Sequence, residues 1–283
     1  MKRIIQLSAV GFGLLATSTE AFAVSASPYR LYDGDGLPIT NSMLMGWVIS
    51  LLIILLVRSM VRRPQLIPST GQAFIESGLG GIRGILESIV GPRMIGPTFP
   101  FLIGLFFFIL LHNWSGLLPG VGAFGHFDSA DHFLYWARPA NADLNMTIAL
   151  GLLSAFGAWF FFVFKYAGLK VLGADLFGNK ANRQEVGTGI WIALFPIFFF
   201  VGLIEVVSIA FRPVSLGFRL FGNVFGGENL LVNMTSLVPF VVPVPFYFLE
   251  TLIGLVQAFV FTLLSAVYIG LICNHGDGHA EAH

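Results

Sequence analysis

The side chains of this sequence that could do chemistry are a few charged residues within an otherwise apolar stretch, residues 187–272. The stretch contains five charged residues, namely Glu205, Arg212, Arg219, Glu228 and Glu250. A guanidinium keeps its proton inside a protein, whereas a carboxylate can gain and lose one. Ionisable side chains are costly in an apolar setting, so these residues are candidates for a functional site.

The spacing of the polar residues predicts a stripe centred on Arg219 along one side of a helix. At about 100° per residue, positions relative to Arg219 are about +40° for Glu205, +20° for Ser208, −20° for Arg212, −40° for Ser215 and +40° for Asn223. Glu228 projects to about the opposite side if the helix is unbroken. On the next helix, the polar residues Glu250 and Gln257 share a face to within about 20°, and Ser265 and Tyr268 follow them.

Two interpretations of a membrane-embedded arginine compete here. A charge near a helix end can simply extend its head group to the membrane surface, and this anchoring interpretation stays open for Arg212. Arg219 fits it poorly, because apolar or small residues flank it for several turns. Placing an arginine at the membrane centre costs roughly 2.5–3.5 kcal/mol. We therefore expect Arg219 to be a functional counter-charge.

The composition requires a membrane setting for these charges. Of the 283 residues, 56% are hydrophobic and 11% are charged, against about 25% charged in soluble domains. The 15 basic and 15 acidic residues give no net charge, which argues against nucleic acid as a partner. The single cysteine, Cys273, excludes a disulfide framework within the chain and a cysteine-rich metal site.

The N-terminal segment, residues 1–23, has the pattern of a cleavable secretory signal. Lys2 and Arg3 precede a short apolar run, and the small residues Ala21 and Ala23 flank Phe22 at the expected cleavage site. A short retained helix is the alternative interpretation. Residues 24–42 are then expected to form an external N-terminal segment.

The elements that position the charged residues are predicted to be helices. Spanning helices are expected at 43–57, about 98–118 and 144 to about 165, with an amphipathic helix at the cytoplasmic interface over 69–91. Arg58, Arg62 and Arg63 follow the first span, and Lys165, Lys170, Lys180 and Arg183 lie at and after the third. By the positive-inside rule, the N-terminus is external and the C-terminus cytoplasmic.

The last two helices are predicted to form a strongly tilted hairpin over 187–272. Prolines at 239, 243 and 245 favour a turn between them. The first helix, about 187–236, would be about 75 Å long, whereas the hydrocarbon core is about 30 Å thick, so it must be tilted, broken or both. The fold class is thus an all-α membrane protein with about five membrane-embedded helices, and residues 43–283 form one integral membrane domain.

Four blocks of the sequence resemble those of a known protein family. Residues 212–223, Arg-Pro-Val-Ser-Leu-Gly-Phe-Arg-Leu-Phe-Gly-Asn, resemble the signature of subunit a in the membrane (Fo) sector of F-type ATP synthases. Residues 256–259 and 266–268 continue the match. Two blocks upstream, 113–120 and 141–147, resemble further family blocks in the expected order. The resemblance covers about residues 65–274.

The resemblance implies an ion-translocating stator beside a ring of c subunits, each with one ionisable carboxylate. Two offset half-channels would carry ions to and from the ring, and Arg219 stands at the position of the family's essential arginine. A deprotonated ring carboxylate needs a positive partner at the interface, whereas a protonated one can face lipid. Because Arg219 stays charged, it could stabilise the anion and obstruct direct ion passage between the half-channels.

The resemblance also suggests roles for the other polar residues. Glu228 and Glu250 match ionisable groups of the external half-channel, although a carboxylate at both positions departs from the common Glu–His pair. Asn223 and Gln257 match residues near the essential arginine, and Glu205 and Ser208 match the cytoplasmic exit. Asp143 and Asn113 are expected to be structural or rim residues, with a functional role as the alternative.

The implied partners are the c-ring, the peripheral-stalk b subunits, other ATP synthase subunits and membrane lipid, with H⁺ favoured over Na⁺ as the ion. No nucleotide motif is visible, so the chain is expected to be non-catalytic by itself and to have no cofactor or metal. The expected location is a bacterial inner membrane. The alternatives are a secondary ion-coupled transporter, for which no internal repeat is visible, and a structural membrane scaffold.

Overall fold

The computed structural model describes residues 27–32, 38–60, 68–118, 121, 125–127, 133–157, 165, 188–237 and 241–275. The predicted signal segment 1–23 lies outside these ranges, as do Lys170, Lys180 and Arg183 of the predicted cytoplasmic loop. Within them the chain forms six α-helices: α2 Asn41–Met60, α3 Thr70–Val90, α4 Pro92–Ser115, α5 Leu144–Leu152, α8 Thr188–Leu237 and α9 Pro243–His275. The prediction of a helical fold is confirmed.

Four of the described helices are long and apolar enough to cross a membrane, namely Asn41–Ser59, Pro92–Ser115, Leu194–Leu237 and Pro243–Gly270. A shorter apolar helix covers Leu144–Gly157, where α5 continues into a π-helical turn, η2 Leu153–Gly157. The predicted span 144–165 is therefore described only in its first part. Two short antiparallel hairpins in the loops were not predicted: β1 Arg30–Tyr32 with β2 Ile39–Thr40, and β3 Gly125–Phe127 with β4 Phe133–Tyr135.

The turn between α3 and α4 lies at Gly91. The backbone φ of Gly91 is 90°, a left-handed conformation that side chains disfavour, and Pro92 directly starts the next helix. The predicted start of this span at residue 98 was therefore too late by about two turns, and the helix also ends earlier, at Ser115. Pro97 and Pro100 lie inside α4, where each removes one backbone hydrogen-bond donor without ending the helix.

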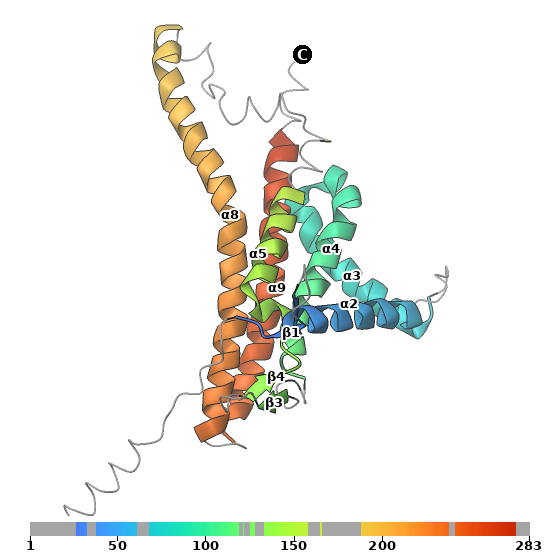
Figure 1. Cartoon of the computed structure of the whole chain (residues 1–283). Helices are drawn as coiled ribbons and strands as arrows, with labels where there is room; N and C mark the ends of the chain where they lie inside the picture. Colours follow the sequence, from blue (N-terminus) through green and yellow to red (C-terminus); the bar gives the residue numbers. More distant parts are fainter. Residues whose placement is uncertain are drawn as a thin grey trace, which may run out of the picture.

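The last two helices form the predicted hairpin, and α8 is unbroken. Its 50 residues correspond to about 75 Å, although Pro196 and Pro213 lie inside it. Figure 1 shows that α8 bends along its length and that α2 runs across the direction of α8 and α9. Since α2 is a candidate membrane span, this arrangement agrees with the strong tilt that the length of α8 predicts.

The core joins α9 to α4 and α8. One buried cluster contains Leu105, Ile109, Leu220, Ala258 and Phe261 among its members, and a second joins α3 through Leu86 and Val90 to Ile269. The helix α5 packs against α8, where Gly151 lies directly against the backbone carbonyl of Pro213. The segment of α8 before Arg219 is thus held between α5 and α9.

Candidate functional site

Arg219 lies on the outer face of α8, where its side chain is exposed. Its neighbours Leu216 and Leu220 are buried in the core, whereas Phe218 is 51% exposed. In the described part of the chain, the guanidinium has no hydrogen bond or ion pair. A cation in an apolar helix with no partner of its own is available to an anion that lies outside this chain.

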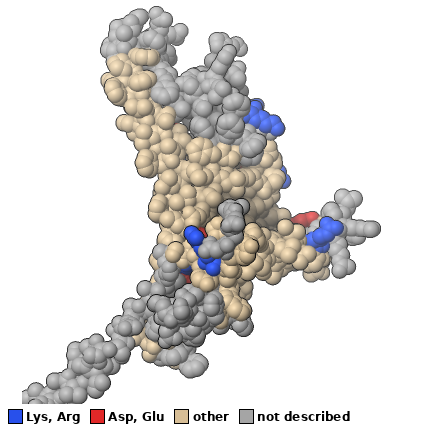
Figure 2. Space-filling model, viewed as in Figure 1, with Lys and Arg blue, Asp and Glu red and all other residues tan. Residues whose placement is uncertain are grey.

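The outer face around Arg219 is largely apolar. Ile204, Phe211 and Phe218 are exposed on it, and so are the hydroxyl residues Ser208 and Ser215. Glu205 is half-buried in the same half of α8. Figure 2 shows few charged atoms on the visible face of the molecule. Such a surface can contact lipid or an apolar partner protein. The predicted polar stripe is the part of this surface that is not apolar.

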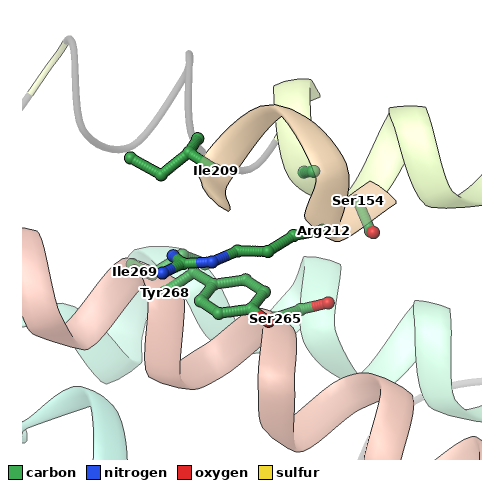
Figure 3. Close-up of a pocket in the computed structure, with 7 residues that line it drawn as sticks. Ser154, Ile209, Arg212, Ser265, Tyr268 and Ile269 are labelled. Atoms are coloured by element: carbon green, nitrogen blue, oxygen red, sulfur yellow. The ribbon is translucent and has the colours of Figure 1, made fainter. Parts of the chain in front are cut away.

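Arg212 departs from the predicted stripe, because its side chain turns toward α9. Its guanidinium carbon lies 4.5 Å from the centre of the Tyr268 ring, a distance typical of a cation–π contact. Figure 3 shows the guanidinium above this ring, with Ser154 of η2 and Ser265 of α9 nearby. A helical projection gives the direction of a Cα–Cβ bond, but a long side chain can bend toward a partner on another helix.

Asn223 and Gln257 join α8 to α9 within the core. The Nδ2 of Asn223 donates a hydrogen bond of 2.9 Å to Oε1 of Gln257. Gln257 is only 4% exposed, and its Nε2 has no hydrogen-bond partner among the described residues. The two amides that were singled out on different helices therefore meet, and one buried donor remains available to a further acceptor.

Glu228 and Glu250 line one cavity of about 550 Å³ between α8, α9 and the end of α4. The other lining residues include Asn113, Thr235 and Tyr247. The two predicted carboxylates therefore share one water-accessible space. It gives no hydrogen bond between them: the described polar partner of Glu228 is a different residue, Arg138.

Arg138 is a candidate functional residue that the sequence interpretation did not select. Its Nη2 lies 3.1 Å from Oε2 of Glu228, and its Nε donates to the same oxygen at 3.3 Å. The side chains of Arg138 and Glu228 are 4% and 19% exposed. Arg138 also donates to the Ser27 carbonyl and lies 5.9 Å from the centre of the Phe225 ring. The sequence did contain a feature that could have identified Arg138, because it is the only Lys or Arg in residues 94–164.

The carboxylate of Glu250 lies directly against the backbone of Gly227. A Cβ atom placed on Gly227 would overlap both carboxylate oxygens. The adjacent Gly226, in contrast, has open space at the same position. Gly227 therefore permits a close approach between α8 and the Glu250 side chain, and a larger residue there would require the carboxylate to move.

A network of buried amides and carboxylates holds the elements behind the cavity. Asn113 donates to the Gly254 carbonyl at 3.0 Å and accepts from Asn141 at 2.7 Å. Asp143 accepts from the Ser42 hydroxyl at 2.9 Å and caps the N-terminus of α5 through the Asn145 N–H. These contacts connect α2, α4, α5 and α9, which agrees with a structural role for Asn113 and Asp143.

The described side chains include no group of three or more His, Cys, Asp or Glu that could hold a metal ion. What they offer is an exposed cation on α8, two carboxylates that line one cavity, and the hydrogen-bonded amides of Asn223 and Gln257. Carboxylates in a wet cavity can take up and release protons, and a permanent cation can stabilise an anion beside them.

The chain matches a known protein family over most of its length. The family model for the ATP synthase A chain matches residues 43–270, which are most of the chain and include α3, α4, α5, α8 and the greater part of α2 and α9. The match contains all of the predicted site residues and Arg138, and with the helical spans it agrees with the resemblance drawn from four sequence blocks. The chain belongs to the ATP synthase A chain family and is a multi-pass, non-catalytic, proton-conducting subunit of ATP synthase.

Proposed function

We propose that this chain is the stator against which a ring of c subunits turns, with Arg219 as the counter-charge to each passing ring carboxylate. The observation that carries the proposal is the exposed guanidinium of Arg219, which has no ion pair within the described residues. A deprotonated ring carboxylate is costly in an apolar interface unless a cation faces it. Because a guanidinium does not release its proton, Arg219 also separates the two half-channels electrostatically.

The remaining candidates are assigned to the two sides of Arg219. Glu228 and Glu250 would pass protons between the external solution and the ring, which is supported by their common cavity of about 550 Å³. Glu205 and Ser208 would lie on the cytoplasmic exit. Asn223 and Gln257, which are joined by a hydrogen bond, would orient water or the guanidinium between the two paths.

Rotation in this mechanism is driven by the membrane potential. Moving one charge through 100 mV is worth about 2.3 kcal/mol. The proposed setting is a bacterial inner membrane, with the N-terminus external, the C-terminus cytoplasmic and peripheral-stalk b subunits as further partners. The proposed ion is H⁺, and no cofactor is assigned to the chain.

Affinity purification tests the assembly part of this proposal. A tag on this chain should recover a c-ring and peripheral-stalk subunits from detergent-solubilised membranes. The purified complex, reconstituted in sodium-free vesicles, should acidify them on addition of ATP. Recovery of the chain as a monomer would refute the stator proposal, and pumping that requires added Na⁺ would refute the choice of ion.

Substitution of Gly227 by Ala is expected to slow proton translocation by about tenfold, because the new methyl group would displace the carboxylate of Glu250 from its place against α8. Gly226→Ala is the matched control, since its Cβ would enter open space while the change in helix propensity is the same. ATP-driven acidification per assembled complex measures both. Equal rates for the two variants would show that the position of Glu250 does not matter to the rate.

A further inference from the structure

The two arginines of the α8 stripe end in different surroundings. Arg212 and Arg219 are seven residues apart and project to within about 20° of each other on a helix. Arg219 is exposed on the outer face, whereas Arg212 is half-buried and directed toward α9. The Cα–Cβ bonds of Arg212 and Arg219 point in nearly the same direction. That direction therefore does not explain why only the Arg219 guanidinium of the two is exposed on the outer face of α8.

The difference comes from Tyr268. Its ring lies under the guanidinium of Arg212 with 4.5 Å between the guanidinium carbon and the ring centre. A cavity of about 20 Å³ beside them is lined by Ile209, Ser154 and Ser265 as well (Figure 3). Within the described ranges, Arg212 has no ion pair and no hydrogen bond to protein, so the Tyr268 ring is the contact that holds its charge.

Release of Arg212 from this ring would return its side chain to the outer face. Its neighbours Phe211 and Ser215 are exposed there, so the face is open beside it. Seven residues of helix separate the two Cα atoms by about 10 Å. A released guanidinium would therefore form a second cationic position about two turns from Arg219.

We propose that Tyr268 is a positioning residue that sequesters Arg212, so that Arg219 is the cation offered to a passing carboxylate. The inference rests on the proposed role of Arg219. A second exposed cation would hold the carboxylate in a competing ion pair, and each passage would then wait for that pair to dissociate. Tyr268 thus acts through Arg212 and does not itself touch the ion or the carboxylate.

The test is a suppression experiment on the complete ATP synthase in inverted membrane vesicles. Tyr268→Leu should slow ATP-driven acidification per assembled complex by about fivefold to thirtyfold, which is the range that a cation–π contact of about 1–2 kcal/mol corresponds to. Tyr268→Phe keeps the ring face and should stay within about twofold of the unmodified chain. Arg212→Gln should also stay within about twofold, because Arg219 remains in place.

The decisive variant is the double substitution Tyr268→Leu with Arg212→Gln, which should recover the rate of Arg212→Gln alone. A purely structural loss at Tyr268 would not be repaired by removing Arg212. Tyr268→Met, which keeps bulk without a ring, repeats the test if the Leu variant assembles poorly. A double variant as slow as Tyr268→Leu, or full speed for Tyr268→Leu itself, would overturn the inference. If Arg219→Ala abolishes pumping while these results fail, the proposed function stands and only the sequestration is wrong.

Discussion

Replacement of Arg219 by Ala is expected to abolish coupled proton pumping while the complex still assembles. The side chain is exposed on α8 and makes no ion pair in the described part of the chain, so its removal costs little packing. The removal also leaves the ring carboxylate without a counter-charge in an apolar interface, which costs roughly 2.5–3.5 kcal/mol. Since each 1.36 kcal/mol is tenfold in rate, translocation should fall by about 100-fold or more.

The measurement is ATP-driven acidification of inverted vesicles, alongside the amount of c-ring recovered with the chain. Arg212→Gln is the matched control, because it removes another arginine from the same helix without removing the exposed charge. Arg219→Lys keeps a positive charge but loses the planar fork, and it should retain only part of the activity. Full coupled pumping by Arg219→Ala would contradict the proposed mechanism.

The second large effect is expected at the buried ion pair between Arg138 and Glu228. Removing Arg138, in an Arg138→Met variant, should destabilise the assembled complex by about 3 kcal/mol, because a largely buried carboxylate would lose its partner. The variant should show a lower melting temperature and less assembled complex. Proton pumping should fall as well, since Glu228 lines the cavity that we assign to the external side.

The double variant Arg138→Met with Glu228→Gln separates charge from packing. Removal of both charges should restore most of the stability, since a neutral pair is often tolerated where a single unpaired charge is not. It should not restore pumping, because the carboxylate is gone. Strictly additive losses of stability in the two single variants and the double variant would show that the pair is not coupled.

The sequence alone determined most of the helical layout. Apolar runs of sufficient length predicted the spans that became α2, α4 and the α8–α9 hairpin, and the three prolines after Leu237 predicted the turn before α9. The start of α4 was predicted about two turns too late, at residue 98 instead of Pro92. The left-handed turn at Gly91, which permits the earlier start, has no periodic signal.

The candidate site was predicted only in part. Arg219, Glu228, Glu250, Asn223 and Gln257 were found because a charge or amide in an apolar helix is conspicuous by its cost. Arg138 was missed because it lies in a polar segment before α5, where a charge carries no cost of burial in an apolar helix, although it is the only Lys or Arg in residues 94–164. Its partner lies 90 residues away in the chain.

The sequence by itself determined which stretches of the chain are helical. It also determined on which side of a helix each polar residue projects, because both features follow from local periodicity. Tertiary structure alone decided which of them meet. The hydrogen bond of Asn223 to Gln257, the close approach of Glu250 to Gly227 and the turn of Arg212 toward Tyr268 depend on how α8 and α9 lie against each other. A helical projection contains no information on that relative placement, since it describes one helix at a time.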